Sequence, residues 1–133
     1  MPKTAKKPVK SKLVKKLDVV FSQWVRLSNA DHRGFCECIT CSKKFFWKEI
    51  QAGHFMSRRH YSTRWDEENV KPQCKACNIY GQGKQYEFSL AIGEKSADLL
   101  EKSRGIVKYT TSDIQAMIEH YQNELKEFQQ KFG

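Results

Sequence analysis

Four cysteines in two Cys-x-x-Cys pairs carry the strongest chemical signal in this sequence. The first pair is Cys38 and Cys41, and the second is Cys74 and Cys77. Two such pairs are typical of a tetrahedral Zn2+ site in which each pair holds the metal from the tip of a tight turn. The sequence therefore predicts a structural zinc bound by four thiolates. Cys36 is an alternative ligand because it lies close to Cys38, but the spacing to Cys41 favours Cys38.

A histidine and two asparagines accompany the cysteine pairs. His54 and Asn69 lie between the pairs, and Asn78 directly follows the second pair. This order is typical of an HNH, or ββα-metal, nuclease centre, and its combination with the cysteines is far more specific than either feature alone. We therefore expect an α+β fold with a small zinc-bound ββα-metal core, flanked by an N-terminal and a C-terminal helix.

Several short runs in the same region resemble one known family. They are Ala52-Gly53-His54-Phe55, Arg64, Asn69-Val70, Gln73-Cys74 and Cys77-Asn78, and they resemble the phage NinG (Rap) recombination proteins, which belong to the HNH nucleases. The arrangement is also similar to the endonuclease VII type of Holliday-junction resolvase, where an asparagine directly after the last zinc cysteine binds the catalytic metal. The resemblance implies an endonuclease that cuts branched recombination intermediates, such as Holliday junctions and D-loops, and leaves 5′-phosphate and 3′-hydroxyl ends.

The chemistry of phosphodiester hydrolysis assigns a role to each of these residues. His54 is the expected base, since an imidazole titrates near neutral pH; the alternatives are a zinc ligand or a buried structural histidine. The Asn69 amide is expected to bridge the backbone of the loop that carries the histidine and to hold the imidazole in line. Asn78 is expected to offer its carbonyl oxygen to a catalytic Mg2+ or Mn2+, although helix capping would also explain an asparagine there.

One position departs from the broad HNH pattern. Many HNH proteins have an aspartate immediately before the histidine as the second ligand of the catalytic metal, whereas this chain has Gly53. NinG-like sequences also have Gly-His here, so we interpret the glycine as a family trait. We predict that His60 completes the site, and the other candidates are Asp66, Glu49 and Glu87.

Positive charge is concentrated near the N-terminus. The chain has a formal net charge of +9, and residues 1–16 contain seven lysines and no acidic residue. Such a distribution indicates a polyanionic partner, and nucleic acid is the first candidate. The alternatives are a solvated tail and, for the loop at 56–65, a surface loop whose aromatic side chains cover a small core. The predicted DNA contacts are Lys6, Lys7, Lys10, Arg58, Arg59 and Arg64.

Composition limits the class of protein. A chain of 133 residues with 39% hydrophobic residues can form one modest domain, to whose stability a structural metal would contribute. No apolar run approaches the roughly 18 residues of a transmembrane helix, so we expect no membrane partner and a cytoplasmic location in the bacterial host of a phage. An odd number of cysteines, five, agrees better with a zinc site than with a disulfide framework.

The sequence divides into four expected segments. They are a basic flexible arm at 1–11, a helix at 12–30, the zinc-bound nuclease core at 31–95 and a helical segment at 96–133. Apolar residues recur every three or four positions in the first and last helices. These stripes should pack on each other, either within one chain or between the subunits of a homodimer.

Short elements are expected inside the core. Strands at 35–39 and 45–50 would form a hairpin around the first zinc turn, with His54 at its end, and Asn78 would open a helix that continues to Gly93. In the last segment, Ser112 and Gln115 match a capping box at the start of the final helix.

Three classes of function are compatible with these features. The favoured class is the nuclease, and because resolving a junction needs two coordinated cuts, a homodimer is expected, with phage or host recombination proteins as further partners. The alternative is a non-catalytic zinc-ribbon module that binds nucleic acid, and Gly53 gives it support. A sequence-specific restriction or homing enzyme is disfavoured because no separate recognition domain is apparent.

Overall fold

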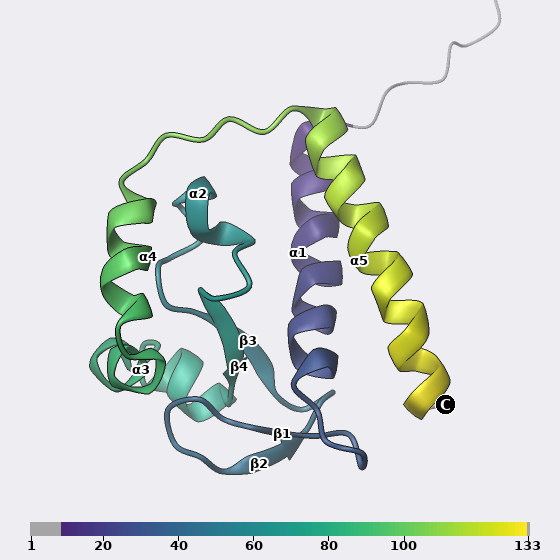
Figure 1. Ribbon diagram of the computed structural model, residues 1–133. Helices are drawn as coiled ribbons and strands as arrows, with labels where there is room; N and C mark the ends of the chain where they lie inside the picture. The colour runs from purple at the N-terminus through teal and green to yellow at the C-terminus, as the bar shows by residue number, and fades with distance from the viewer. Residues whose placement is uncertain (1–8, 133) are drawn as a thin grey trace, which may run out of the picture.

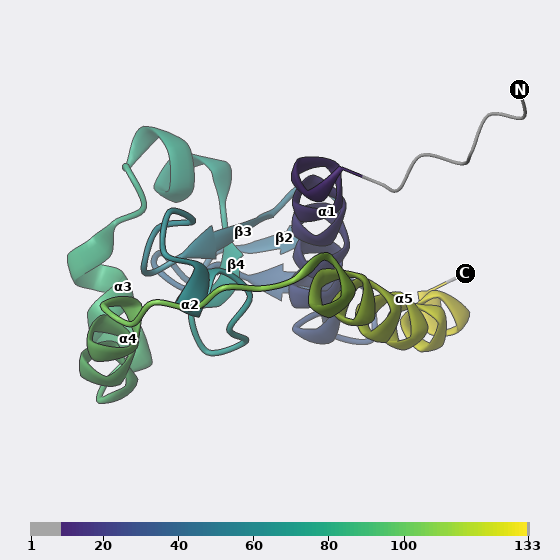
Figure 2. The same ribbon diagram turned by 90° about the horizontal axis from the view of Figure 1, so that it is seen from above.

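Two long helices, α1 and α5, pack side by side along one edge of the molecule (Figure 1, Figure 2). The computed structural model describes residues 9–132, so the predicted DNA contacts Lys6 and Lys7 lie outside the described residues. α1 spans Lys10–Ser28 and α5 spans Thr111–Phe132. Their apolar stripes bury each other within one chain and share one core with β4. These stripes are therefore not available as the seam of a homodimer.

The start of α5 corrects the predicted capping box. The backbone N–H of Thr110 donates to Oδ2 of Asp113 at 2.8 Å, and the N–H of Asp113 donates to Oγ1 of Thr110 at 3.0 Å. This reciprocal pair takes the place predicted for Ser112 and Gln115. Both pairs have the required spacing, but the helix begins at Thr111, so only Thr110 has the capping position.

Two separate antiparallel hairpins take the place of the single one predicted. β1, Phe35–Glu37, pairs with β2, Lys44–Phe46, whereas β3, Gln51–His54, pairs with β4, Val70–Gln73. The predicted strand at 45–50 ends early because a turn follows Phe46. The N–H of Glu49 closes that turn by donating to the Phe46 carbonyl at 2.8 Å, while the N–H of Trp47 extends the β1–β2 pairing by donating to the Gly34 carbonyl at 2.8 Å.

The segment between β3 and β4 contains a short helix where the sequence predicts only a loop. This helix, α2, spans Tyr61–Arg64, and α4, Lys95–Ser103, packs against it on the side away from α5 (Figure 1). The Ser62 hydroxyl donates to the Lys102 carbonyl at 2.7 Å and joins the two helices. The segment between β3 and β4 is thereby attached to α4 as well as to the two strands.

The helix predicted to open at Asn78 is two elements. A short π-helix, η1, spans Ala76–Tyr80, and α3 spans Gln85–Ile92. Between them the backbone has positive φ at three successive residues, which are Gln82, Gly83 and Lys84. Left-handed residues cannot continue a right-handed helix, so the chain turns here.

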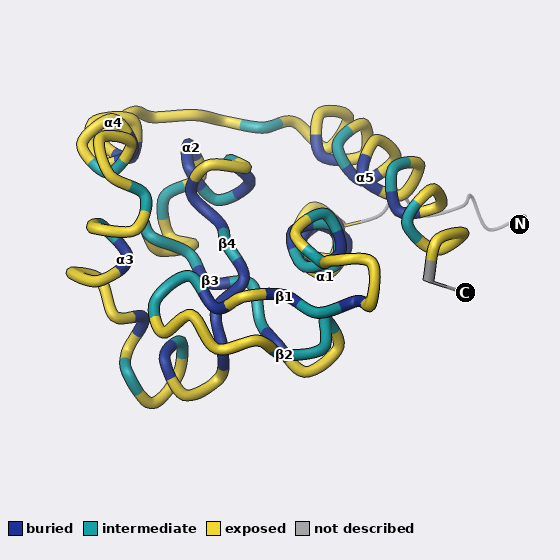
Figure 3. Tube along the Cα trace, turned by 60° about the horizontal axis from the view of Figure 1, so that its bottom comes forward, coloured by how far each residue is buried: buried dark blue, intermediate teal, exposed yellow. Residues whose placement is uncertain are grey.

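Burial is greatest where these elements meet. β4 is covered on both sides, whereas α3 and α4 expose much of their surface (Figure 3). A second, smaller core surrounds the cysteines and includes Ile50. None of the helices in the described part of the chain is long and apolar enough to cross a membrane.

Candidate active site and metal centre

The four cysteines of the two Cys-x-x-Cys pairs meet at one point. Cys38 and Cys41 lie between β1 and β2, Cys74 follows β4, and Cys77 belongs to η1. Their sulfur atoms all lie within 4.8 Å of one another, and the Sγ atoms of Cys41 and Cys74 are 3.7 Å apart. Thiolates about 2.3 Å from a tetrahedral zinc ion would lie roughly 3.8 Å from each other. The cysteines are therefore positioned to bind a metal ion, and this donor set fits a structural Zn2+.

The fifth cysteine, Cys36, has a different environment. Its side chain is fully buried, and its Sγ donates to the carbonyl oxygen of Arg26 at 2.9 Å. Burial raises the pKa of Cys36 to about 11, so it stays a thiol at neutral pH. Cys36 also lies outside the four-sulfur group, so the structure favours Cys38 as the ligand.

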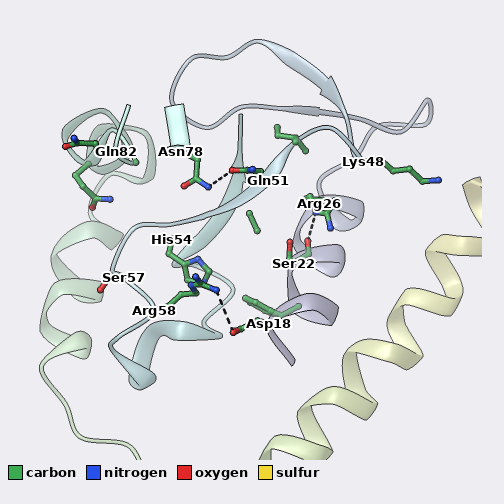
Figure 4. Close-up of a pocket in the computed structure, with 15 residues that line it drawn as sticks. Asp18, Ser22, Arg26, Lys48, Gln51, His54, Ser57, Arg58, Asn78 and Gln82 are labelled. Atoms are coloured by element: carbon green, nitrogen blue, oxygen red, sulfur yellow. Dashed lines mark hydrogen bonds and ion pairs between the residues drawn. The ribbon is translucent and has the colours of Figure 1, made fainter. Parts of the chain in front are cut away.

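A cavity of about 650 Å3 opens between α1, β3 and η1 (Figure 4). His54 reaches it from the end of β3, and Asn78 reaches it from η1. Gln51 of β3, Asp18 of α1 and Arg58 of the loop after β3 also line it. His54 and Asn78, on which the sequence hypothesis depends, therefore line one cavity together with charged and polar neighbours.

The imidazole of His54 is held in one tautomer. Its Nε2 lies 3.0 Å from the carbonyl oxygen of Arg64. Because a carbonyl oxygen only accepts, Nε2 carries the hydrogen, and Nδ1 of the neutral ring has a free lone pair. Burial lowers the pKa of His54 to about 4. The ring is therefore neutral at pH 7, the state in which a histidine can accept a proton.

This lowered pKa predicts a loss of stability in mild acid. The unfolded chain binds a proton at His54 near pH 6.5 and the folded protein only near pH 4, so the stabilisation is complete above pH 6.5 and falls as the pH is lowered. The contribution is up to about 1.4 kcal/mol per pH unit in this window. Urea unfolding at about pH 7 and about pH 5.5 should show a smaller pH dependence for His54→Gln than for the natural protein. An equal pH dependence of the free energy of unfolding in the two proteins would contradict the lowered pKa of His54.

Asn69 is fully buried beside the histidine loop. Its Oδ1 accepts the N–H of Met56 at 2.8 Å, and its Nδ2 donates to the carbonyl oxygens of Met56 and Thr63, both at 3.0 Å. Met56 follows His54 closely, and Thr63 precedes Arg64, whose carbonyl accepts from the imidazole. The amide thus holds the backbone on both sides of the His54–Arg64 contact, which is the geometry that an orienting role requires.

Asn78 lies inside η1 rather than at its N-terminal cap, so capping does not explain it. Its Nδ2 donates to Oε1 of Gln51 at 2.8 Å. With Nδ2 bonded to Gln51, Oδ1 is the other end of the Asn78 amide. Gln51 has no role in the sequence hypothesis. The sequence signal that could have indicated Gln51 is the alternation of side chains along β3, which places Gln51 on the opposite face from Ala52 and His54.

The residues predicted to replace the missing aspartate are not found at the cavity. His60 directly precedes α2, and the carboxylate of Asp66 is 2.6 Å from Nζ of Lys102. The cavity lining includes none of the four candidates His60, Asp66, Glu49 and Glu87. At Gly53 itself the space beside the backbone is filled, because a Cβ placed there would lie 2.2 Å from Oε1 of Gln73.

Asp18 of α1 is a site residue that the sequence hypothesis misses. Its carboxylate accepts from Arg64 through Nη2 at 2.6 Å and Nε at 3.1 Å, and from Nε1 of Trp65 at 3.0 Å. These bonds raise the pKa of Arg64 and fix the end of α2, whose carbonyl faces His54. The Arg64 side chain, predicted to contact DNA, is thus turned inward. The available signal is that Asp18 is the lone acidic residue among the first thirty.

Comparison with known proteins adds a decisive match. Residues 1–131 match the family described as "Bacteriophage Lambda NinG protein". The chain belongs to the phage lambda NinG family. It is similar to "Protein ninG" of Escherichia phage 933W and of Enterobacteria phage VT2-Sa, with 27% identity over 95 residues in each case. The match covers 68% of this chain and 47% of each relative, so the chain spans about half the length of the curated relatives it matches. No solved structure matches it.

The protein has a second cavity, of about 530 Å3, which we term the basic groove. Its charged and aromatic lining residues are Lys10, Lys15, Arg64, Lys108, Tyr61 and Tyr109, and no acidic side chain of the described residues lines it. Arg58 and Arg59 are two further predicted DNA contacts, and neither lines this groove. Arg58 lines the first cavity with 62% of its side chain exposed, and Arg59 is exposed.

Proposed function

We propose that this NinG-family protein is a metal-dependent HNH endonuclease that cuts branched DNA, of the Holliday-junction or D-loop type, in phage recombination. The observation that supports this most strongly is that His54 and Asn78 line one cavity. Apart from the short α2 between the strands, the order β3, β4, η1 also agrees with the strand–strand–helix order of a ββα-metal core. Two of the zinc-site cysteines, Cys74 and Cys77, flank the step from β4 into η1 and would hold that core in shape.

In this proposal each residue has a distinct task. His54 takes a proton from the attacking water at Nδ1, while its Nε2–H stays bonded to the Arg64 carbonyl. Asn69 keeps this contact aligned, and Asn78 would offer Oδ1 to a catalytic Mg2+ or Mn2+. When bound, such a cation neutralises charge on the reacting phosphate and the departing 3′ oxygen. Arg58 is exposed at the cavity and would bind a neighbouring phosphate.

The basic groove offers a path for the DNA strand that leads away from the cavity. Residues Ser11, Lys15, Asp18, Ser22 and Arg26 recur every three or four positions and therefore share one face of α1. The first two line the groove and the other three line the cavity. At 1.5 Å per residue, Lys15 and Ser22 are only about 10 Å apart along the helix. A strand cut at His54 could thus place its flanking phosphates on the lysines and its bases on the tyrosines.

Charge reversal in the basic groove should weaken DNA binding without changing the chemistry. We expect Lys15→Glu with Lys108→Glu to lower junction affinity by about tenfold or more and to reduce the slope of log K against log salt by about 2, because two phosphate contacts are lost. Fluorescence anisotropy across a salt series measures both quantities. The matched control, Lys126→Glu with Lys131→Glu, makes the same charge change on exposed residues of α5. Equal losses in both variants would mean that only net charge matters.

The proposed activity is tested by presenting zinc-loaded protein with a labelled four-way junction and with linear duplex of the same sequence. In Mg2+ or Mn2+ we expect cuts near the branch point, with 5′-phosphate ends, and much slower cutting of the duplex. Equal cutting of both substrates would remove the branch preference. No cutting of either substrate in either ion would remove the nuclease assignment.

The second candidate function is a non-catalytic zinc-ribbon module that binds nucleic acid. The absence of a carboxylate at Gly53 favours it, because one asparagine alone is a weak ligand set for Mg2+. Tight junction binding without any cleavage would be its signature. Both functions use the basic groove, so cleavage separates them and binding does not.

Coordinated cutting of a junction requires two centres, so we propose that the active form is a homodimer. Since α1 and α5 use their apolar stripes on each other, the seam must lie on another surface. Phage or host recombination proteins are the further partners in this proposal. Light scattering with and without junction DNA reports the stoichiometry.

A further inference from the structure

One buried oxygen atom, on a residue that lies beside the cavity without lining it, has no hydrogen-bond partner among the described residues. It is Oε1 of Gln73, whose side chain is completely buried at the end of β4. The Nε2 of the same amide donates to the Gly83 carbonyl at 2.8 Å and to Oγ1 of Thr40 at 3.1 Å. Because a carbonyl only accepts, the amide cannot be turned around, and the oxygen must be the unpaired end. A buried amide oxygen without a partner is costly, so it calls for a missing partner.

The direction of this oxygen is set by the register of the β3–β4 hairpin. Gln73 is opposite Gln51, and Gly53 is opposite Lys71. Side chains two positions apart in a strand share a face, so Gln73, Gln51 and position 53 all belong to one face of the hairpin. A Cβ placed on Gly53 would lie 2.2 Å from Oε1 of Gln73. The amide oxygen therefore occupies the place where a side chain at position 53 would begin.

The proposed metal ligand is on the same face of the hairpin. Asn78 is bonded to Gln51 at 2.8 Å, and Gln51 is the cross-strand partner of Gln73. The Gly83 carbonyl, which orients the Gln73 amide, also lines the cavity together with Asn78. The Gln73 amide is thus fixed by its bond to the Gly83 carbonyl, and the Asn78 amide is bonded to Gln51 on the same face of the hairpin.

We propose that Gln73 supplies the second protein oxygen for the catalytic cation, in place of the carboxylate that HNH proteins carry before the histidine. This rests on the proposed nuclease function. The metal-binding oxygen is then carried by position 73 on β4 instead of position 53 on β3. Position 53 must stay without a side chain, because the Gln73 side chain fills that space. Amide oxygens are suitable ligands for Mg2+ and Mn2+. Since the amides of Gln73 and Asn78 are both neutral, the cation binds weakly to the protein alone and much more tightly when a DNA phosphate adds negative charge.

The test is a titration of zinc-loaded protein with Mn2+, followed by the electron paramagnetic resonance signal of free Mn2+, with and without junction DNA. Gln73→Met keeps the length of the side chain but removes its oxygen. We expect it to weaken Mn2+ binding by about tenfold or more, as Asn78→Ala should, while the zinc content stays at one per chain. Gln122→Met on the exposed face of α5 is the matched control and should leave Mn2+ binding unchanged.

A second set of variants, at positions 53 and 73 together, tests the proposal without relying on Gln73→Met. Gly53→Asp alone should bind Mn2+ poorly and unfold at a lower temperature, because Gln73 fills the space that its Cβ needs. Combining it with Gln73→Gly removes the side chain in the way and should restore folding and Mn2+ binding at least to the natural level. Binding of Mn2+ that depends on Asn78 but is unchanged in Gln73→Met and not restored in the double variant would overturn the Gln73 proposal and leave the nuclease proposal standing. Absence of any second Mn2+ site in the natural protein, with no cleavage, would overturn both.

Discussion

The Cys38→Ser protein is expected to lose its zinc and the ordered structure of its metal centre. The four sulfurs join the β1–β2 turn, the end of β4 and η1, and the first two of these are otherwise linked by hydrogen bonds such as that from the N–H of Ile39 to the Pro72 carbonyl at 2.9 Å. The core around them contains only one buried aliphatic side chain, Ile50, so packing alone cannot replace the metal. Structural zinc contributes on the order of 10 kcal/mol or more to the folding of small domains. We therefore expect the unfolding transition of this part to be lost, while the α1–α5 pair, with its separate core, keeps much of its helix content.

Zinc content by atomic absorption, together with far- and near-ultraviolet circular dichroism, measures this loss. Cys36→Ser is the matched control, since it makes the same atomic change two residues away and its hydroxyl can still donate to the Arg26 carbonyl. We expect Cys36→Ser to keep one zinc per chain with a modest loss of stability, about 1–2 kcal/mol. If Cys38→Ser kept its zinc and Cys36→Ser lost it, the assigned ligand set would be wrong.

The metal centre could be predicted from sequence because its information is local. Each Cys-x-x-Cys pair defines its own turn, and two such turns need only meet. The hairpins could not be predicted in the same way. The residues from Phe45 to Ile50 have the composition of a strand, and the turn that interrupts them, closed by the hydrogen bond from the N–H of Glu49 to the Phe46 carbonyl, contains no glycine or proline. The division of the helix after Asn78 was equally hidden, because two of the three left-handed residues there, Gln82 and Lys84, are not glycine.

The same distinction applies to the candidate site. His54, Asn69 and Asn78 belong to one continuous motif, and their types and order indicate their roles. Asp18 lies outside it, and Gln73, although it stands in one of the runs that resemble NinG, has no role assigned from sequence, because the contacts of both residues arise only in the fold. Asp18 bonds to Arg64 across 46 positions, and the importance of Gln73 depends on the space beside Gly53. The departure at Gly53 was visible in the sequence, but its physical reason, an occupied space, was not.

Replacing His54 with alanine is expected to abolish cleavage while leaving junction binding nearly intact. In the proposed mechanism the neutral imidazole that lines the cavity is the base, and since its Nε2 is bonded to the Arg64 carbonyl, Nδ1 is the nitrogen left for the proton of the attacking water. Loss of a general base costs roughly 10²- to 10⁴-fold in rate. The DNA contacts that we propose, on the basic groove and Arg58, are unchanged in the variant, so the dissociation constant should change by less than about threefold. Single-turnover cleavage of a labelled junction and a binding titration in Ca2+ measure the two quantities separately.

His60→Ala is the matched control, because it removes the same ring from the loop that follows β3, at a position that does not line the cavity. Its cleavage rate should stay within about threefold of the natural rate, and both variants should keep one zinc per chain. A His60→Ala protein as inactive as His54→Ala would instead assign the chemistry to the loop as a whole or return His60 to the metal site. A fully active His54→Ala protein would exclude the imidazole as the base, since none of the other described histidines lines this cavity. The contrast between two histidines six positions apart therefore tests whether the buried, single-tautomer ring carries the chemistry.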